Sequence, residues 1–236
     1  NLPIGLLGAY ATRKLMPDFR PAKRPRFDVA GFVLFGAFTL SIILGIESLS
    51  QDSLLAPGWL LGIAVAALTL YSLHASRSKH PLFALSLFRL RSFSVGISGT
   101  LMSRLGSGAM PFLTPLMMQV GLGHSPSVAG MSMIPLTLTG MATKPFMSGM
   151  IRRFGYRAVL SWNTLAQGGL ICSMALVGPQ TSLWLIIALL SLIGVANYIQ
   201  FTAMGTVTLT ELGDHQASSG TGLMSVTIQL SIGLAV

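Results

Sequence analysis

One basic residue, Arg104, lies inside a long apolar stretch of this 236-residue chain. A charge at the centre of a membrane helix costs about 2.5–3.5 kcal/mol on insertion scales, so an arginine there is a functional candidate by default. Its neighbours one helical turn away, Thr100 and Gly108, are small, and small residues let a second helix approach closely. We therefore expect Arg104 to face the interior of a helix bundle. There it binds a substrate group, pairs with a carboxylate of another helix, or ties helix ends together through backbone carbonyls.

Several amide side chains lie in other apolar stretches and are spaced to share helix faces. Asn163 and Gln167 have i, i+4 spacing, and Asn197 and Gln200 have i, i+3 spacing, so each pair lies on one side of a helix. Such amides either line a polar cavity or simply hydrogen-bond between helices, and the residues leave both possibilities open. The candidate substrate-binding or coupling residues are Arg104, Gln119, Asn163, Gln167, Asn197, Gln200 and Gln229.

The sequence lacks the patterns typical of enzymes. It contains no HExxH, CxxC, GxGxxG or Walker pattern and no pair of carboxylates inside an apolar stretch, and its 4 histidines are dispersed. The single Cys172 stands in an apolar segment without metal-binding neighbours. We therefore expect no enzyme, no metal site and no bound cofactor.

The composition indicates a membrane protein. Hydrophobic residues make up 52% of the chain and charged residues only 9%, whereas soluble domains carry roughly 25% charged residues. The apolar stretches approach the length of about 20 residues that a spanning helix needs, and they do not alternate as the strands of a membrane barrel would. We predict an all-α, polytopic transmembrane helix bundle. The predicted helical segments are 2–16, 29–46, 54–73, 93–120, 128–147, 158–177, 183–204 and a last one from about 217 onward.

The positive charges are placed at every second connection between these segments. The chain has 15 Lys and Arg against 6 Asp and Glu, a formal charge of +9, and in a soluble protein this balance would indicate nucleic-acid binding. All of the 15 except Arg104, however, lie in or beside the first, third and fifth connections. Cytoplasmic loops of membrane proteins carry the excess of Lys and Arg. We therefore expect these connections to face the cytoplasm, and no nucleic-acid partner.

The third connection mixes leucine and phenylalanine with Arg89 and Arg91 over residues 82–91. This pattern favours an amphipathic helix that lies on the membrane surface. A plain apolar tether is the alternative.

Several stretches resemble the major facilitator superfamily. Residues 148–157, Ser-Gly-Met-Ile-Arg-Arg-Phe-Gly-Tyr-Arg, resemble the second copy of its loop G-x-L-x-D-R-x-G-R-R, with Arg152 at the acidic position. This similarity implies an inward-side gating loop whose residues are Gly149, Arg152, Arg153, Gly155 and Arg157. Other stretches are similar to the fourteen-helix drug:proton antiporter class, namely residues 1–5, 26–28, 81–83 with 87–89, and 217–220 with 229–230.

The resemblance implies part of a major facilitator fold, from about family helix 6 to helix 13. Residues 1–26 would be the last helix of the N-terminal half with a cytoplasmic loop, and 27–74 a two-helix central insert. Residues 75–92 would be a cytoplasmic amphipathic linker, and 93–236 a C-terminal transmembrane bundle that is cut short. The missing N-terminal half of the same chain would then be a partner of these residues.

The resemblance also implies a function in the bacterial cytoplasmic (inner) membrane. It points to a multi-pass secondary transporter that exports lipophilic drugs or other small molecules by alternating access, driven by the proton gradient. The partners would be the lipid bilayer, a small-molecule substrate and protons. Because every Asp and Glu lies in a connection or near a segment end, we expect the proton-coupling acid upstream of Asn1. Two alternatives stay open: a proton-coupled transporter of an organic anion or metabolite, which Arg104 suits, and a non-transporting membrane sensor or scaffold.

Overall fold

The computed structural model describes residues 2–16, 27–50, 55–78 and 80–235, and its regular structure in these ranges is helical, as predicted. The shorter helical segments are η1 (Ser48–Ser50), η2 (Leu85–Arg89) and the π-helical η3 (Met117–Gly121). The α-helices are α1 (Leu2–Leu15), α2 (Val29–Glu47), α3 (Leu55–Arg77), α4 (Arg91–Ser107), α5 (Met110–Leu116), α6 (Pro126–Ala142), α7 (Lys144–Met174), α8 (Leu183–Thr210) and α9 (Asp214–Ala235).

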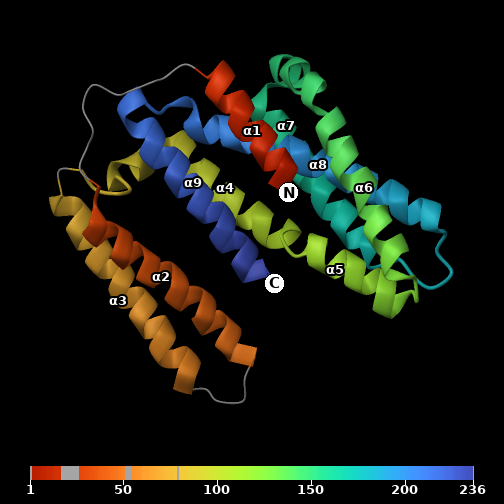
Figure 1. The fold of residues 1–236 in the computed structure, drawn as a ribbon, viewed down its shortest axis with the longest axis horizontal. Helices are drawn as coiled ribbons and strands as arrows, with labels where there is room; N and C mark the ends of the chain where they lie inside the picture. Colours follow the sequence, from red (N-terminus) through yellow and green to blue (C-terminus); the bar gives the residue numbers. More distant parts are fainter. Residues whose placement is uncertain (1, 17–26, 51–54, 79, 236) are drawn as a thin grey trace.

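By length and composition, 3 of the described helical stretches are long and apolar enough to cross a membrane, namely Val29–Glu47, Pro57–Arg77 and Leu183–Thr210. Figure 1 shows the α3–α4 and α8–α9 connections on one side of the molecule. The end of α2, the α5–α6 connection and the α7–α8 connection lie on the opposite side. The helices therefore run back and forth, as in a multi-pass membrane protein.

Helix α8 lies at the centre of the bundle and packs against α4, α6 and α7. Its contact with α6 is close at Gly194, where an added Cβ would stand 2.8 Å from the carbonyl carbon of Leu136. Thr139 reinforces the same contact, because its hydroxyl donates to the carbonyl oxygen of Ser191 at 2.8 Å. Small residues and interhelical hydrogen bonds of this kind hold membrane helices together where lipid gives no hydrophobic driving force.

Helices α2 and α3 form a hairpin that packs together along its length. One end of the hairpin joins the rest of the protein through a cluster of buried apolar side chains from α3, the α3–α4 linker, α4 and α9. The cluster contains Tyr71, Ala75, Phe83, Leu87, Phe93, Ile97 and Leu223. This junction connects the hairpin to the bundle.

The prediction of a surface helix over residues 82–91 is wrong. Leu85–Arg89 is a 3₁₀ segment and α4 begins only at Arg91, and Phe83 and Leu87 are 8% and 0% exposed. The backbone N–H groups of Leu82 and Phe83 bond to the side chains of Asp28 and Tyr71. Donors bound in this way are not used in a regular helix. Phe83 and Leu87 pack into the junction, whereas Leu85 and Phe88 are 38% and 47% exposed, so contact of the linker with a membrane surface stays a prediction.

Many large side chains of the described helices face outward. Helix α1 has no buried residue, and Trp59, Trp162 and Trp184 are 60%, 74% and 79% exposed. A soluble monomer rarely leaves so much apolar area uncovered. This outer surface is typical of helices that face lipid.

Asp28 caps the N-terminus of α2 and bonds to three different segments. Its Oδ1 accepts from the Gly31 N–H at 2.9 Å and lies 2.8 Å from His74 Nε2, and its Oδ2 accepts from the Leu82 N–H at 3.0 Å. Burial by itself would raise the pKa of this carboxyl. The hydrogen bonds outweigh burial and hold the pKa of Asp28 below its ordinary value of 3.8.

A lowered pKa makes the stability of this junction depend on acid pH. The Asp28 carboxylate contributes its full stabilisation above the unfolded-state pKa and loses it as pH falls through the lower folded-state pKa. Asp28→Asn keeps a helix cap but removes the charge. We expect the unfolding free-energy difference between parent and variant, measured in detergent, to shrink as the pH falls from about 4 through the lowered folded-state pKa of Asp28. A difference that stays constant over this interval would show that the charge contributes nothing.

A candidate substrate pocket between α4, α8 and α9

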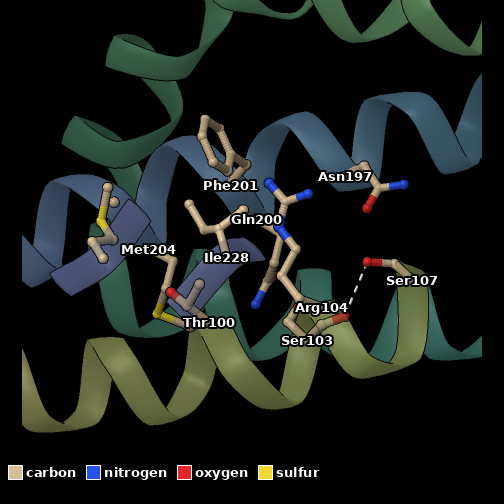
Figure 2. Close-up of a pocket in the computed structure, with 11 residues that line it drawn as sticks. Thr100, Ser103, Arg104, Ser107, Asn197, Gln200, Phe201, Met204 and Ile228 are labelled. Carbon is tan, nitrogen blue, oxygen red and sulfur yellow. Dashed lines mark hydrogen bonds between the residues drawn. The ribbon is translucent and has the colours of Figure 1, made fainter. Parts of the chain in front are cut away.

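Arg104 extends from α4 toward α8 into a small pocket (Figure 2). Its guanidinium carbon lies 4.8 Å from the centroid of the Phe201 ring, a cation–π contact. The lining residues are Thr100, Ser103, Arg104, Ser107, Asn197, Gln200, Phe201, Met204, Gly205, Met224 and Ile228. The pocket therefore combines one cation with hydroxyls, amides and apolar side chains.

The prediction that the Arg104 face looks into the bundle is confirmed. Thr100 is only 7% exposed. Gly96, two turns before Arg104, lies so close to α8 that an added Cβ would stand 2.9 Å from the Cα of Thr208. The small residues of α4 thus bring Arg104 against α8.

No carboxylate lies within ion-pair distance of Arg104 among the residues that the structure describes. Its polar surroundings are neutral, with the hydroxyls of Ser103 and Ser107 on α4 and the amides of Asn197 and Gln200 on α8. A partly buried cation without a counter-charge favours binding of an anionic group. In this conformation the pocket has room for roughly one water molecule.

The two predicted amide pairs meet each other between α7 and α8. Asn163 donates from Nδ2 to Gln200 Oε1 at 2.8 Å and to the Ala196 carbonyl oxygen at 2.9 Å. Gln167 donates from Nε2 to Asn197 Oδ1 at 2.9 Å. Asn197 and Gln200 therefore line the pocket, while Asn163 and Gln167 orient them from behind.

Two other candidates lie outside this pocket. Gln119 is exposed in η3 and donates to the carbonyl oxygen of Pro115 at 3.2 Å. Gln229 is exposed on α9, whereas Met224 and Ile228 are the residues of that helix that line the pocket. Their part in transport stays a prediction without support from this site.

Sequence reasoning missed Phe201 as a pocket residue. It stands four residues after Asn197, so the same helical face carries both side chains. A search of the helix face of Asn197 one turn further along the sequence would have identified Phe201. The apolar pocket residues of α9 gave no such signal, because nothing in the sequence pairs α9 with α4.

The structure corrects the prediction that residues 148–157 form a connecting loop. The span α7 consists of two helices that meet at a kink at Gly155, where φ is +73° and ψ is 159°. The first of them begins at Lys144, with Pro145 in its first turn. Gly149, Arg152 and Arg153 precede this kink and Arg157 follows it. The arginines are exposed, and Arg153 stacks on the Phe154 ring at 5.3 Å.

Gly155 has a backbone conformation that essentially only glycine adopts. Gly155→Ala is expected to cost about 1–3 kcal/mol of stability, because a Cβ is strained there even though open space surrounds it. Thermal unfolding in detergent measures the effect. Gly149→Ala is the control, since Gly149 is helical, faces open space and gains helix propensity from alanine. Equal unfolding temperatures of Gly155→Ala and Gly149→Ala would show that a Cβ at position 155 causes no backbone strain.

A scan against protein-family models found no matching model. Similarity to individual proteins is extensive. The chain is 42% identical over 238 residues to "Putative multidrug resistance protein MdtD" of Serratia proteamaculans. It is 42% identical over 239 residues to the protein of that name in Pectobacterium atrosepticum, and 41% identical over 242 residues to that of Escherichia coli strain UTI89.

These alignments cover 100% of the chain but only 50–51% of each relative. The chain thus spans about half the length of the curated relatives it matches. The similarity runs through α4, α8 and α9 and so includes the pocket. Over its whole length, the chain is therefore similar to proteins named putative multidrug resistance protein MdtD.

Proposed function

We propose that the protein is a secondary active transporter that exports lipophilic small molecules across the bacterial cytoplasmic membrane by alternating access, coupled to protons. The pocket between α4, α8 and α9 carries this proposal, because it joins a cation, amides and apolar side chains at the centre of the bundle. The relatives' name, multidrug resistance protein, supports the same class of substrate.

The pocket has the features that an adaptable apolar site needs. Phe201, Met204, Met224 and Ile228 supply its apolar surface, and methionine adapts its shape to different ligands. Helix α4 ends at Ser107, and α5 begins after a short break and contains Pro115. The two residues between these helices, Gly108 and Ala109, keep helical backbone angles. Kinked helices are tolerated in membranes where they line cavities, so this region is a natural place for the pocket to open.

An organic anion is the second candidate substrate, and Arg104 favours it. The described residues offer no carboxylate near Arg104 that could attract a cationic drug or neutralise the guanidinium. An anionic headgroup on an apolar body would satisfy both parts of the pocket. This candidate differs from the first in substrate charge but not in transport mechanism.

We place the proton-coupling carboxylate in the part of the transporter that this chain does not cover. The carboxylates whose surroundings the structure describes are Asp28, Glu47 and Glu211, and each lies at a helix end. A coupling acid normally lies within a transmembrane bundle. If neutralising every acid upstream of Asn1 in the longer protein leaves coupling intact, this placement is wrong.

Accumulation measurements in intact cells separate the candidate functions. Cells that produce the whole protein are given a fluorescent lipophilic cation or a labelled organic anion, with and without an ionophore that collapses the proton gradient. Lower accumulation of the cation with the gradient supports drug export, and the same result for the anion alone supports the second candidate. The absence of any gradient-dependent change for either compound would contradict transport and favour a membrane sensor or scaffold.

A further inference from the structure

The α3–α4 linker is hydrogen-bonded by side chains from three parts of the fold. The Leu82 N–H donates to Asp28 Oδ2, before α2, at 3.0 Å. The Phe83 N–H donates to the hydroxyl oxygen of Tyr71, in α3, at 2.8 Å, and that hydroxyl donates to the Phe83 carbonyl oxygen at 2.9 Å. The Ala84 N–H donates to Ser219 Oγ, in α9, at 3.1 Å. Three consecutive backbone donors are therefore bound by side chains from three separate helical regions.

The Ser219 hydroxyl also donates to the carbonyl oxygen of Leu82 at 3.2 Å, so α9 contacts the linker through both a donor and an acceptor. His74 adds a contact from the end of α3 to Asp28 at 2.8 Å. The linker is thus bonded on one side to the α2–α3 hairpin and on the other side to α9.

Aromatic packing follows the same path. The Phe35 ring of α2 packs edge-on against Tyr71 and Phe83, with centroid distances of 5.2 Å and 4.8 Å. On the other side of Phe83, an added Cβ at Gly222 of α9 would stand 3.2 Å from the ring. The Phe83 side chain is therefore held between the hairpin and α9.

A second contact joins the hairpin to α9 further along the helix. An added Cβ at Gly233 would lie 3.3 Å from Cδ1 of Ile43 in α2. Gly222 and Gly233 are separated by close to three helical turns and lie on one face of α9. The same face of α9 thus meets the linker near its start and α2 near its end.

We propose that Asp28, Tyr71 and Ser219 are positioning residues that clamp residues 82–84, so that the α2–α3 hairpin and α9 move as one body. Helix α9 lines the Arg104 pocket with Met224 and Ile228, so the clamp ties the hairpin to one wall of that pocket. Its consequence for transport rests on the proposed function, whereas the clamp itself does not. The clamp also brings together Asp28, Leu82 and Ser219, one residue from each of three stretches singled out in the sequence.

Distances between spin labels test the clamp directly. Labels are attached at Trp59→Cys, at the end of α3 far from the clamp, and at Gln229→Cys on α9, in a Cys172→Ser background, with the whole protein in lipid vesicles. Both labelled positions are exposed. We expect one narrow distance distribution in the parent and a broadened or shifted one in the Asp28→Ala/Ser219→Ala double variant. An unchanged distribution in the double variant overturns the proposal.

Two single variants separate the clamp from general effects of mutation. Ser225→Ala is the matched control, because the Ser225 hydroxyl bonds only within α9, to the Thr221 carbonyl oxygen at 2.9 Å. It should leave the distribution unchanged. Ser219→Thr keeps a hydroxyl and should stay closer to the parent than Ser219→Ala. A response of Ser225→Ala equal to that of Ser219→Ala would contradict a specific clamp.

Transport kinetics test the positioning role. For a compound that the parent exports, Ser219→Ala should lower the maximal rate several-fold with little change in KM, because Ser219 does not line the pocket. A changed KM with an unchanged maximal rate would contradict positioning and place Ser219 in substrate binding. If the parent exports no test compound, the proposed function fails, while the label distances still decide on the clamp.

Discussion

Arg104→Ala is expected to abolish export of an anionic substrate or to raise its KM strongly, while the protein stays in the membrane. A hydrogen bond to a charged group contributes about 1.5–3 kcal/mol, which corresponds to roughly 10- to 100-fold in affinity. The protein itself should not lose stability, because among the described residues no carboxylate pairs with Arg104 and would be left without a counter-charge in the variant. Substrate uptake into inverted vesicles and the amount of membrane-inserted protein are the two measurements.

Two further arginine variants sharpen this test. Arg104→Lys keeps the charge but loses the planar guanidinium that lies over the Phe201 ring, so we expect an intermediate effect. Arg91→Ala removes a cation from the exposed start of the same helix and should leave KM unchanged. Full transport by Arg104→Ala would show that the guanidinium has only a structural role.

Gly194→Ala is expected to cause a large loss of stability. The added Cβ would stand 2.8 Å from both the Leu136 carbonyl carbon and the Thr139 hydroxyl oxygen, and a backbone carbonyl cannot rotate away. Helices α6 and α8 must separate, which also lengthens the hydrogen bond from Thr139 to Ser191. Overpacking of this kind costs about 1–3 kcal/mol, and thermal unfolding in detergent measures it.

The control for this variant lies on the same helix. An added Cβ at Gly205 has only the end of the flexible Met224 side chain near it, at 3.9 Å. Gly205→Ala should therefore unfold close to the parent temperature. If both variants unfold together, the close approach at Gly194 does not limit the packing of α6 on α8.

Helix positions were predictable from the sequence where a helix is uniformly apolar. The segment predicted at 29–46 is the helix Val29–Glu47. The prediction succeeds because the run of apolar residues and the helix end at nearly the same residue. The segment predicted at 54–73 extends in the structure to Arg77, since backbone hydrogen bonding continues beyond the apolar residues. Around residues 148–157 the chain stays helical up to a kink at Gly155, where a second helix starts, and the apolar pattern did not reveal the helix before the kink.

The candidate site was predictable only in part. The sequence identified Arg104 from the cost of its charge, and the spacing of Asn197 and Gln200 placed both on one face. It could not show that Asn163 and Gln167 would bond to that face from α7, because pairing between helices depends on their packing. For the same reason the sequence could not show that Ile228, and not its neighbour Gln229, lines the pocket.

The three exposed tryptophans determine what intrinsic fluorescence reports in this protein. Trp59, Trp162 and Trp184 lie on α3, α7 and α8, and each side chain is more than half exposed on the outer surface. Lipids with brominated acyl chains should therefore quench most of the emission. Emission changes on adding a ligand will reflect motion of the helices relative to lipid, since none of these indoles lines the Arg104 pocket. A tryptophan placed at Phe201 would supply the missing signal from the pocket itself.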